Sequence, residues 1–436
     1  MLSISGSLNS HHLGASHLII VFAMETIALD RIEVRNNVVE YHYSVSQKLK
    51  RFFKTDKMFI EYDEAMDGVP MSLLSIPFVS CMAGLMWITD CTVFVDEIDK
   101  TFYESLFRLK RAYQELHYDF QLKGLLVPSI IATNDLRESS ESLLLFGGGV
   151  DCHSSFLRNR DKISHFCNIY GWLNDLNQEN KADESDKKHT ADYAQRMGVQ
   201  ALHVRSNFAS QFNLRKIDVS FYSKIYPGYW YGFLHSMAFI SIAIPLCFKK
   251  DIANIIIASS FTKGRTNVRC GSYITTDSQF AYEGNGAVLH DGFELSRQQK
   301  VKLIVDYQKK SGQPYPIQVC SFNDHNCCEC EKCFRTIIAI VAENGDPRQF
   351  GFEYEGSLKQ HWENVINRKI AQWASEKENY YYQQTGQRMI ENYEEIEDKE
   401  FVDWFLSIDL YKAKRVAKRN YRITNVFSIL KRKLHL

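Results

Sequence analysis

Three consecutive glycines follow an apolar run and precede an aspartate in the stretch LLLFGGGVDCHSSF, residues Leu143–Phe156. Glycines after a buried strand let the chain turn tightly and bring successive N–H groups close to a ligand, and a following helix adds its positive N-terminal end. Gly147, Gly148 and Gly149 are therefore predicted to form a phosphate-binding turn. The spacing does not fit GxxxxGK(S/T) or GxGxxG, so neither a conventional P-loop nor a dinucleotide fold is favoured. A tight connection without a ligand is the alternative.

Five of the eleven cysteines lie between residues 320 and 333. Cys320, Cys327, Cys330 and Cys333 follow a C-x6-C-x2-C-x2-C pattern, with Cys328 as an additional thiol. Four thiolates in so short a span suit a tetrahedral Zn²⁺ ion, which fixes a loop that lacks a core of its own. An iron–sulfur cluster is the alternative. The choice of Cys327 over Cys328 follows from the spacing alone.

Further polar side chains that could contact a ligand follow strand-like segments or precede the cysteine loop. These candidates are Ser206, Asn207, Asp277, Arg297 and Lys300. A cation such as Arg297 or Lys300 would stabilise charge that develops on a transferred phosphate. Asp151 or Asp277 could help to hold Mg²⁺. A surface ion pair or a helix cap is the simpler explanation for each of them.

From Ser142 onward, strands and helices are predicted to alternate along the chain. Strands are expected at 142–146, 163–172, 200–208 and 251–260. Helices are expected from the glycines to about Arg160, over 188–198 and over 233–246. This alternation predicts an α/β fold with a doubly wound parallel sheet, in which ligands bind at the C-terminal ends of the strands. The glycine turn ends the first of these strands.

Residues 24–140 are expected to form an N-terminal α+β unit. The segment 27–45 alternates and is rich in β-branched residues, as strands are, and a further strand is expected at Thr92–Val95. A helix is expected near 100–116, because apolar residues recur there at three- and four-residue spacing. No catalytic grouping stands out in this unit. A structural or substrate-shaping role is therefore predicted for it.

The C-terminal part of the chain, residues 346–436, is polar and aromatic and is expected to be a helical extension. From Lys412 onward it carries nine Lys or Arg residues and no acidic residue. Such a basic, partly amphipathic tail could contact RNA, another phosphate-rich partner or anionic lipid. The simpler interpretation is a solvated tail that packs its few apolar residues on the core.

Composition limits the remaining classes of protein. The 436 residues carry 52 basic and 52 acidic side chains, so no overall charge attracts nucleic acid or membrane. No apolar segment is expected to span a bilayer, because the closest, Phe233–Phe248, is interrupted by His235 and Pro245; a buried helix is expected there. Residues 1–23 are expected to be an unstructured leader that makes a poor signal peptide. Clustered thiols indicate a reducing compartment, so the protein is expected in the cytoplasm.

The glycine stretch FGGGVDCHSS resembles the PP-loop signature SGGxDS of the ATP pyrophosphatases and adenylating ligases. That superfamily includes asparagine synthetase, GMP synthetase, tRNA thiolation enzymes and 7-cyano-7-deazaguanine synthase. In its members the loop holds the β- and γ-phosphates of ATP, which is cleaved between the α- and β-phosphates. Motif positions are matched here by Gly148, Gly149, Val150 and Asp151.

Two positions depart from that signature. Gly147 stands where the motif has its first serine, and Cys152 stands where it has its last. Each difference removes a hydroxyl group expected near the pyrophosphate, although the backbone N–H donors remain. Ser154 and Ser155, one turn into the helix, could replace these hydroxyls. Loss of catalysis is the alternative.

The cysteine pattern is similar to the zinc site of the 7-cyano-7-deazaguanine synthases. Together the two resemblances cover residues 141–345, which are predicted to form a PP-loop (HUP-like) ATP-binding domain with a four-cysteine zinc site. ATP, Mg²⁺ and Zn²⁺ are the cofactors that the resemblance implies. The residues expected to bind the nucleotide are Gly147, Gly148, Gly149, Val150, Asp151, Ser154, Ser155, Ser206, Asn207 and Asp277. The residues expected to act in catalysis are Asp151, Arg297 and Lys300.

The resemblance implies a divergent, larger relative of 7-cyano-7-deazaguanine synthase that adenylates its substrate. Such an enzyme cleaves ATP to AMP and pyrophosphate and activates a carboxylate or amide oxygen of an acceptor, here unidentified, for attack by a nitrogen nucleophile. No glutaminase motif is visible, so ammonia would be free or delivered by a partner protein. Modification of tRNA or of a protein terminus, and a catalytically degenerate nucleotide-binding scaffold, are the alternatives. The oligomeric state stays open, a homodimer included.

Overall fold

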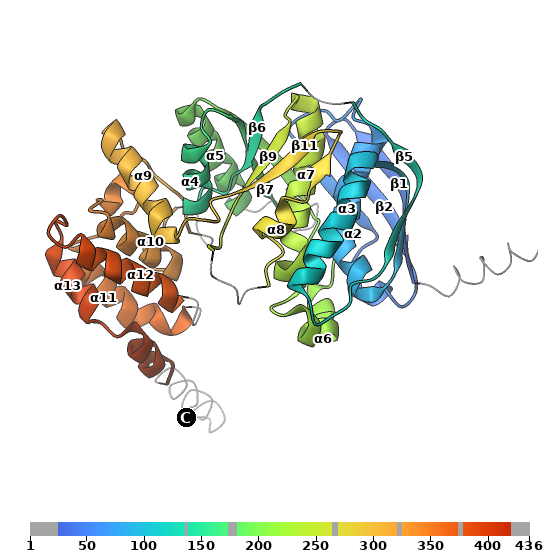
Figure 1. The fold of residues 1–436 in the computed structure, drawn as a ribbon. Helices are drawn as coiled ribbons and strands as arrows, with labels where there is room; N and C mark the ends of the chain where they lie inside the picture. The colour runs from blue at the N-terminus through green and yellow to red at the C-terminus, as the bar shows by residue number, and fades with distance from the viewer. Residues whose placement is uncertain are drawn as a thin grey trace, which may run out of the picture.

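The computed structural model describes residues 25–135, 138–172, 181–263, 269–320, 325–373 and 378–419 (Figure 1). The predicted leader, residues 1–23, and the basic tail from residue 420 onward lie outside the described residues. The strands are β1 (Thr26–Arg35), β2 (Val38–Val45), β3 (Lys57–Tyr62), β4 (Thr92–Asp99), β5 (Leu125–Ala132), β6 (Ser142–Leu145), β7 (Ile163–Tyr170), β8 (Gln200–Ser206), β9 (Asn254–Ala258), β10 (Ala281–Tyr282) and β11 (Gly286–Asp291). The α-helices are α2 (Met71–Thr89), α3 (Lys100–Leu116), α4 (Val150–Arg158), α5 (Lys181–Met197), α6 (Leu214–Ile225), α7 (His235–Lys250), α8 (Ile274–Asp277), α9 (Arg297–Ser311), α10 (Glu331–Ala342), α11 (Leu358–Lys369), α12 (Glu378–Glu391) and α13 (Lys399–Ser407).

The strands of the described chain form one sheet, in the order β10-β11-β9-β6-β7-β8-β3-β2-β1-β4-β5. From β11 to β8 the neighbours are parallel, and only the short β10 runs antiparallel to its neighbour at that edge. Strands β3, β2 and β1 continue the sheet in antiparallel order, and β4 and β5 are again parallel. The prediction of an α/β fold is therefore confirmed, and the large sheet is mostly parallel. The strands of residues 24–140 extend this same sheet.

The strand order reverses at β6. The chain runs from β6 to β7 and β8 on one side, then crosses to β9 and β11 on the other. Open α/β sheets bind ligands in the crevice beyond the carboxyl ends of their strands, at the point where the order reverses. The glycine turn follows the end of β6 and so lies at this point.

Alternate residues of the parallel strands pack into two different cores. Leu143 and Ile255 belong to the core that includes α2 and α7. Their neighbours Leu144 and Ile256 belong to the core beneath α4 and α5. Helices therefore cover both faces of this part of the sheet, as the doubly wound arrangement requires (Figure 1).

Strand β3 joins the two halves of the sheet by pairing with β8. The Ser206 hydroxyl, at the end of β8, donates a hydrogen bond to the C=O of Phe59 at 2.7 Å. Asn207 accepts from the N–H of Phe59 at 2.8 Å and donates to the C=O of Lys57 at 3.2 Å. Ser206 and Asn207, which the sequence analysis assigns to nucleotide binding, thus bond to the backbone of the neighbouring strand.

The helices α9 to α13 form a separate helical group beside the sheet, on the left of Figure 1. Its core includes Phe334 of α10, Trp362 of α11 and Phe401 of α13, each fully buried. Val150, the first residue of α4, belongs to the same core. The C-terminal helices therefore pack directly against the start of the helix that follows the glycine loop.

Two helical segments are long and apolar enough to cross a membrane by length and composition. They are Met71–Thr89 and Trp230–Lys250, whose most apolar windows are 94% and 78% buried inside the structure. The sequence analysis overlooked the first, which is a continuous helix although it contains Pro77. The second contains the helix expected near residues 233–246. Buried core helices have the same length and composition, so neither segment by itself indicates a membrane span.

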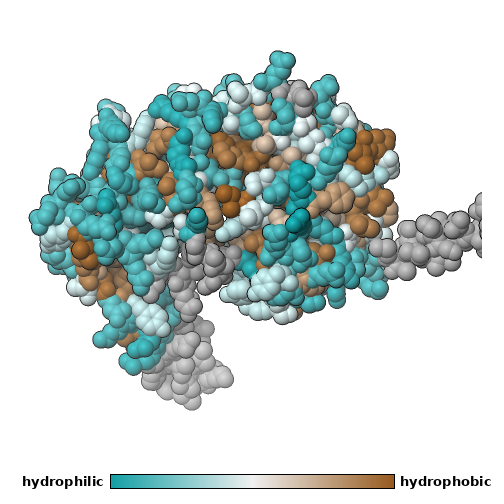
Figure 2. Space-filling view, viewed as in Figure 1, coloured by the Kyte–Doolittle hydropathy of each residue, from teal (hydrophilic) through white to brown (hydrophobic). Residues whose placement is uncertain are grey.

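The open edge of the sheet at β5 is exposed and apolar. Leu125, Val127, Ile130 and Ile131 have exposed fractions between 42% and 57%, and Figure 2 shows brown surface at this edge, on the right. The N–H of Leu125 donates to the C=O of Cys91, directly before β4. Backbone groups of successive residues in a strand point to opposite sides, so those of Pro128, three residues further on, face the open side of the sheet. Proline has no N–H to donate, which interrupts pairing with another strand.

We expect Asn207→Ala to lower the free energy of unfolding by about 1–3 kcal/mol, because buried backbone groups of β3 lose their partner. Urea unfolding followed by circular dichroism measures this change. Asn207→Asp keeps an oxygen acceptor for the N–H of Phe59 but places a second oxygen against the C=O of Lys57, so it should not restore the stability. Equal stability of Asn207→Ala and the native chain would contradict this role at the β3–β8 junction.

Candidate functional site

The glycine loop connects the end of β6 to the start of α4. Gly149 is the N-cap residue of α4, and Gly148 has a φ of 71°, a left-handed conformation that favours glycine. The C=O of Gly148 accepts a hydrogen bond from the N–H of Gln318 at 2.8 Å. A Cβ at Gly148 would lie 3.3 Å from the Cβ of Gln318, whereas a Cβ at Gly147 meets no atom of the described chain within 4 Å. Gly148 is therefore required by the turn itself, and Gly147 borders open space.

Cys152, which stands where the motif has a serine, is buried, and so are Ser154 and Ser155, which could replace the missing hydroxyl groups. The Cys152 thiol donates to the C=O of Gly149 at 3.1 Å and packs in the core beneath α4. Burial raises the pKa of Cys152 to about 12, so the thiol is protonated at neutral pH. Ser154 and Ser155 are 1% and 2% exposed. The Ser154 hydroxyl has no hydrogen-bond partner among the described residues.

Asp151 joins α4 to α9 by two ion pairs. Its Oδ1 lies 3.1 Å from Nζ of Lys300, and its Oδ2 lies 3.4 Å from Nη1 of Arg297. Lys300 also donates to the C=O of Ser259, just beyond the end of β9. The structure thus brings together the three residues that the sequence analysis expects to act in catalysis. It places them beside the two strands at which the order reverses.

The neighbouring charges keep the carboxyl group of Asp151 ionised. Burial alone would raise the pKa of Asp151, but Lys300 and Arg297 lower it, and the net pKa lies below its usual value. Burial lowers the pKa of Arg297 against the attraction of Asp151, and an arginine stays protonated throughout the physiological range. Two basic side chains therefore face a single carboxylate at the glycine loop. Such a group favours binding of an anion.

Residues 315–320 run beside the glycine loop and lead into the cysteine loop. Besides the bond from Gln318 to Gly148, the hydroxyl of Tyr315 lies 2.9 Å from Nδ1 of His153 on α4. Burial lowers the pKa of His153 to about 3, so this ring is neutral at physiological pH. These contacts fix the start of the cysteine loop relative to the glycine loop.

Asp277 belongs to a different group of buried side chains. Nδ1 of His290, in β11, lies 2.8 Å from its Oδ2, and the hydroxyl of Ser272 donates to the same oxygen at 2.9 Å. In the described part of the chain Asp277 makes no ion pair with the cations around Asp151. The structure therefore gives Asp277 partners of its own, as it does Ser206 and Asn207.

Four cysteine side chains converge at the start of α10. The sulfurs of Cys320, Cys327, Cys330 and Cys333 all lie within 4.8 Å of one another. The Sγ–Sγ distance is 3.5 Å from Cys330 to Cys333 and 4.0 Å from Cys327 to Cys333. Zinc–sulfur bonds of about 2.3 Å in a tetrahedron place the sulfurs about 3.8 Å apart. The cluster predicted from the spacing is confirmed as a group that could hold a metal ion.

The structure also separates the two adjacent cysteines. Cys328 is buried outside the cluster, at a φ of 50°, and its C=O lies 2.7 Å from Nε2 of His361. Within the cluster, contacts with Cys330 and Cys333 hold the pKa of Cys327 below its usual value. The contact with Cys327 raises the pKa of Cys330 to about 11 and that of Cys333 further. A bound metal would displace the remaining protons.

Comparison with known proteins does not assign this chain to a family. No protein-family model matches the chain, and no curated protein matches it. The chemistry of the site is therefore argued from its own residues and from the resemblance of its two motifs.

Sequence reasoning missed three residues beside the ion pairs: Lys332 and Arg335 on α10, and Tyr381 on α12. The guanidinium of Arg335 lies 5.4 Å from the centre of the Tyr381 ring, and that of Arg297 lies 6.0 Å from it. Arg335 also contributes to the lowered pKa of Asp151. A signal for the two cations existed, because they flank Cys333 in the segment CEKCFR. Tyr381 lies in a part of the chain for which the sequence analysis had no motif.

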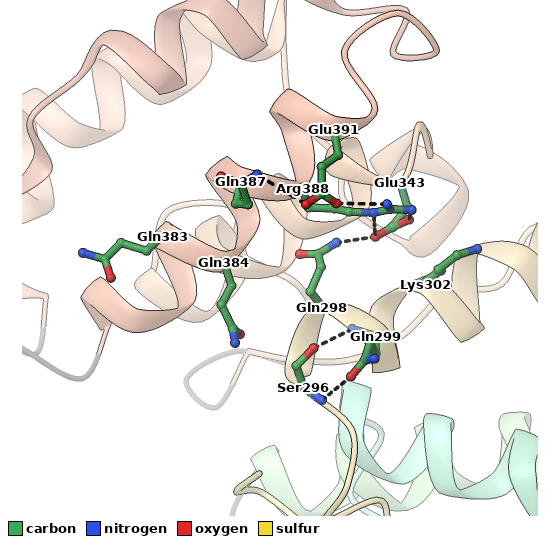
Figure 3. Close-up of a pocket in the computed structure, with 10 residues that line it drawn as sticks. All are labelled: Ser296, Gln298, Gln299, Lys302, Glu343, Gln383, Gln384, Gln387, Arg388 and Glu391. Atoms are coloured by element: carbon green, nitrogen blue, oxygen red, sulfur yellow. Dashed lines mark hydrogen bonds and ion pairs between the residues drawn. The ribbon is translucent and has the colours of Figure 1, made fainter. Parts of the chain in front are cut away.

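A polar cavity of about 690 Å³ lies between α9 and α12, whose side chains face each other across it (Figure 3). Arg388 pairs with Glu343 at 2.9 Å, and Gln298 donates to the same carboxylate at 2.9 Å. The glutamines of the lining are Gln298, Gln299, Gln383, Gln384 and Gln387. A second cavity of about 10 Å³ shares Gln298 and Gln384 with the first and is also lined by Arg297. The interface of α9 with α12 therefore reaches the ion pairs of the glycine loop.

The matched pair Gly148→Ala and Gly147→Ala tests the conformation of the loop. We expect Gly148→Ala to lower the free energy of unfolding by about 1–2 kcal/mol, because a Cβ is strained at positive φ and approaches Gln318. Gly147→Ala should change it by less than about 0.5 kcal/mol, because its Cβ meets no described atom. Chemical unfolding of both variants measures the difference. A larger loss at Gly147 than at Gly148 would contradict this geometry.

Removal of one cluster sulfur should remove the metal. We expect Cys330→Ser to lose bound zinc and to lower the melting temperature, because metal binding contributes directly to the folding of such a loop. Cys328→Ser, outside the cluster, is the matched control and should keep one zinc per chain. Elemental analysis and thermal unfolding measure both effects. Iron and inorganic sulfide in the native protein would instead indicate an iron–sulfur cluster.

Proposed function

We propose that this chain is an ATP-dependent adenylating enzyme of the PP-loop type that carries a structural zinc ion. The observation that supports this proposal most directly is one juxtaposition. A glycine loop, the N-terminus of a helix, the buried Lys300 and the partly buried Arg297 meet where the strand order of a parallel sheet reverses. Each of these features favours the phosphate groups of a nucleotide.

In this proposal the open side of the glycine loop receives the β- and γ-phosphates. Gly147 borders open space there, and α4 begins directly after Gly149, so backbone N–H groups and the helix dipole act on the same ligand. Arg297 and Lys300 lie beside the loop and balance the negative charge of the leaving pyrophosphate. Asp151 holds these two cations in position by its ion pairs.

The reaction transfers the adenylyl group of ATP to an acceptor. An oxygen of the acceptor, as a carboxylate, attacks the α-phosphorus in line, and the bond to the β-phosphate oxygen breaks, which releases pyrophosphate. A nitrogen nucleophile such as ammonia then adds to the activated carbonyl carbon. AMP leaves with the bonding electron pair, the nitrogen loses a proton, and an amide is formed. Positioning and charge stabilisation are what the protein contributes to the first step.

The two metals of the proposal differ in how well the residues fit them. The four thiols suit a closed, structural zinc site, which would fix the start of α10 and the loop before it. Asp151 offers no unpaired oxygen, because one is paired with Lys300 and the other with Arg297. A magnesium ion would therefore be held chiefly by the phosphates of ATP and by water, as is common for this ion.

A second candidate function, a nucleotide-binding scaffold without turnover, is favoured by the buried thiol of Cys152. This thiol donates to the C=O of Gly149 and packs in the apolar core, so it offers no hydroxyl to the loop. Gly147 offers none either. If the scaffold is correct, ATP cleavage appears only when both serines are restored by Gly147→Ser and Cys152→Ser. Cleavage by the native protein would exclude it.

Purified, metal-replete protein should form AMP and pyrophosphate from ATP·Mg²⁺ in the presence of ammonium and a suitable carboxylate. Asp151→Ala releases Lys300 and Arg297 from their positions and should lower product formation by about 100-fold or more. Calorimetric titration of ATP and quantification of AMP measure binding and turnover separately. No binding at millimolar ATP would exclude the proposal.

The ionisation of Asp151 adds a prediction on pH. Because the pKa of Asp151 is lowered in the folded protein, the ion pairs are present above the usual carboxyl range and are lost only as the pH falls through the lowered value. ATP affinity should therefore stay constant down to about pH 4 as far as this group is concerned. Calorimetric titration across pH measures it. A loss of affinity centred between about pH 5 and 6 would show that another group controls binding.

A further inference from the structure

Three polar side chains lie together on the outer face of strands β1 and β2, the face turned away from the main core. Val39 and Tyr41 of β2 belong to that core, so Glu40 and His42, which alternate with them, point to the opposite face. Glu33 of β1 is directly opposite Glu40 in the register of the two strands. Residues that face each other in this way share one face of the sheet. The pairing therefore brings two carboxylates and one imidazole together.

The ligand atoms of these three side chains have nearly the spacing of a metal site. Nε2 of His42 lies 3.6 Å from Oε1 of Glu33 and 3.6 Å from Oε2 of Glu40. One ligand atom from each of the three residues lies within 4.8 Å of the other two. Bonds of about 2.1 Å from one ion in a tetrahedron place the ligand atoms about 3.4 Å apart. Small side-chain movements therefore bring all three atoms onto one ion.

The nitrogen that faces the two carboxylates is buried and has no hydrogen bond. His42 is only 9% exposed, and its Nε2 has no hydrogen-bond partner among the described residues. At 3.6 Å the two carboxylate oxygens lie beyond hydrogen-bond length. A buried polar atom without a partner is rare in native proteins and calls for a specific explanation, such as an ion or a water molecule. Here the atom is aimed between two anions, which is the place for a cation.

Two arginines at the edge of the group now balance the carboxylates. Arg31 and Arg35 each have a nitrogen 2.5 Å from a carboxylate oxygen of Glu33, and Arg35 lies 3.8 Å from Glu40. The arginine side chains are 59% and 68% exposed. Ion pairs of such exposed side chains contribute little to stability. Both guanidiniums can therefore turn into the solvent when another cation takes their place.

Arg31 also controls the protonation of the imidazole. Its Nη2 lies 3.5 Å from Nδ1 of His42. An arginine can only donate, so this contact favours the tautomer that carries its proton on Nε2. A metal ion needs the lone pair of Nε2, so the proton must move to Nδ1 and the guanidinium must leave. A metal ion and Arg31 therefore compete for the same side chains.

We propose that Glu33, Glu40 and His42 form a second metal site, which binds a divalent transition ion such as Zn²⁺. An imidazole nitrogen suits this ion, whereas Ca²⁺ and Mg²⁺ prefer oxygen ligands alone. Three protein ligands leave a coordination position open for water or for a small ligand, in contrast to the closed site of four cysteines. The second metal site shares no residue with the glycine loop, so this proposal is independent of the adenylating function.

Titration with Zn²⁺ tests this site on the full chain, without nucleotide, after dialysis to one zinc per chain in the cysteine cluster. The native chain should bind one further Zn²⁺. His42→Gln and Glu40→Gln should each weaken it by at least about 10- to 100-fold, because even groups behind a metal ligand contribute this much. Glu61→Gln is the matched control, since Glu61 lies on the neighbouring β3 and pairs with Arg205 at 3.2 Å. It should change the affinity by less than about twofold. Calorimetry and elemental analysis measure affinity and stoichiometry.

A second variant predicts the opposite sign. Arg31→Gln removes the competing cation, so it should tighten the further Zn²⁺ several-fold. A group that serves only as an ion-pair network predicts no further zinc in this variant or in the native chain. Arg31→Gln also decides the matter if His42→Gln does not fold. Millimolar Ca²⁺ should leave the further zinc in place, and its displacement would contradict a nitrogen ligand.

The outcomes separate this proposal from the adenylating function. A native chain that takes up no further zinc, or one whose further zinc is equally tight in His42→Gln and Glu40→Gln, would overturn the second metal site even if the protein cleaves ATP. A further zinc that requires His42, in a protein that does not bind ATP, would support the second metal site and overturn the adenylating function.

Discussion

One partly buried carboxylate holds the centre of this molecule together. Asp151 faces Lys300 and Arg297, and Lys300 in turn reaches the backbone at Ser259. Since the buried ammonium group of Lys300 would be costly without its partners, α4, α9 and the end of β9 are held against one another at the crevice of the sheet. The orientation of the glycine loop, and through Gln318 the start of the cysteine loop, depend on this arrangement. The packing of these elements and the position of the charges at the glycine loop therefore depend on the same ion pairs.

Much of the fold and both motifs could be predicted because their signals are local. Hydrophobic periodicity indicated α3 and the alternation from β6 to β9, and the short spacing of the cysteines indicated their cluster. Distant pairings leave no such local trace. The bond between β3 and β8 unites residues far apart in sequence, and it makes the N-terminal strands part of the main sheet. The helix α2 was overlooked for a different reason, because a run buried on every side has no amphipathic period.

The same distinction applies to the candidate site. The rule that strand ends present polar residues to ligands identified the correct edge of the sheet, and it led to Asp151, Arg297 and Lys300. It could not tell which polar residues at that edge are engaged by the protein itself. Asn207 offers the same amide to a ligand or to a neighbouring backbone, and here it bonds to β3. The cations of α10 were missed because their meeting with Arg297 depends on how three helices pack.

The antiparallel junction also changes where the sheet ends. Without the N-terminal strands, β8 would be the border of the parallel sheet, and its unpaired backbone groups would offer a template to any other chain. With them, the border moves outward to β5, where Pro128 breaks the row of donors. The strands β1 to β5 thus cover the edge of the parallel sheet that carries the glycine loop. A fragment that starts at β6 would be prone to self-association through the exposed edge of β8, even if every residue of its site were intact.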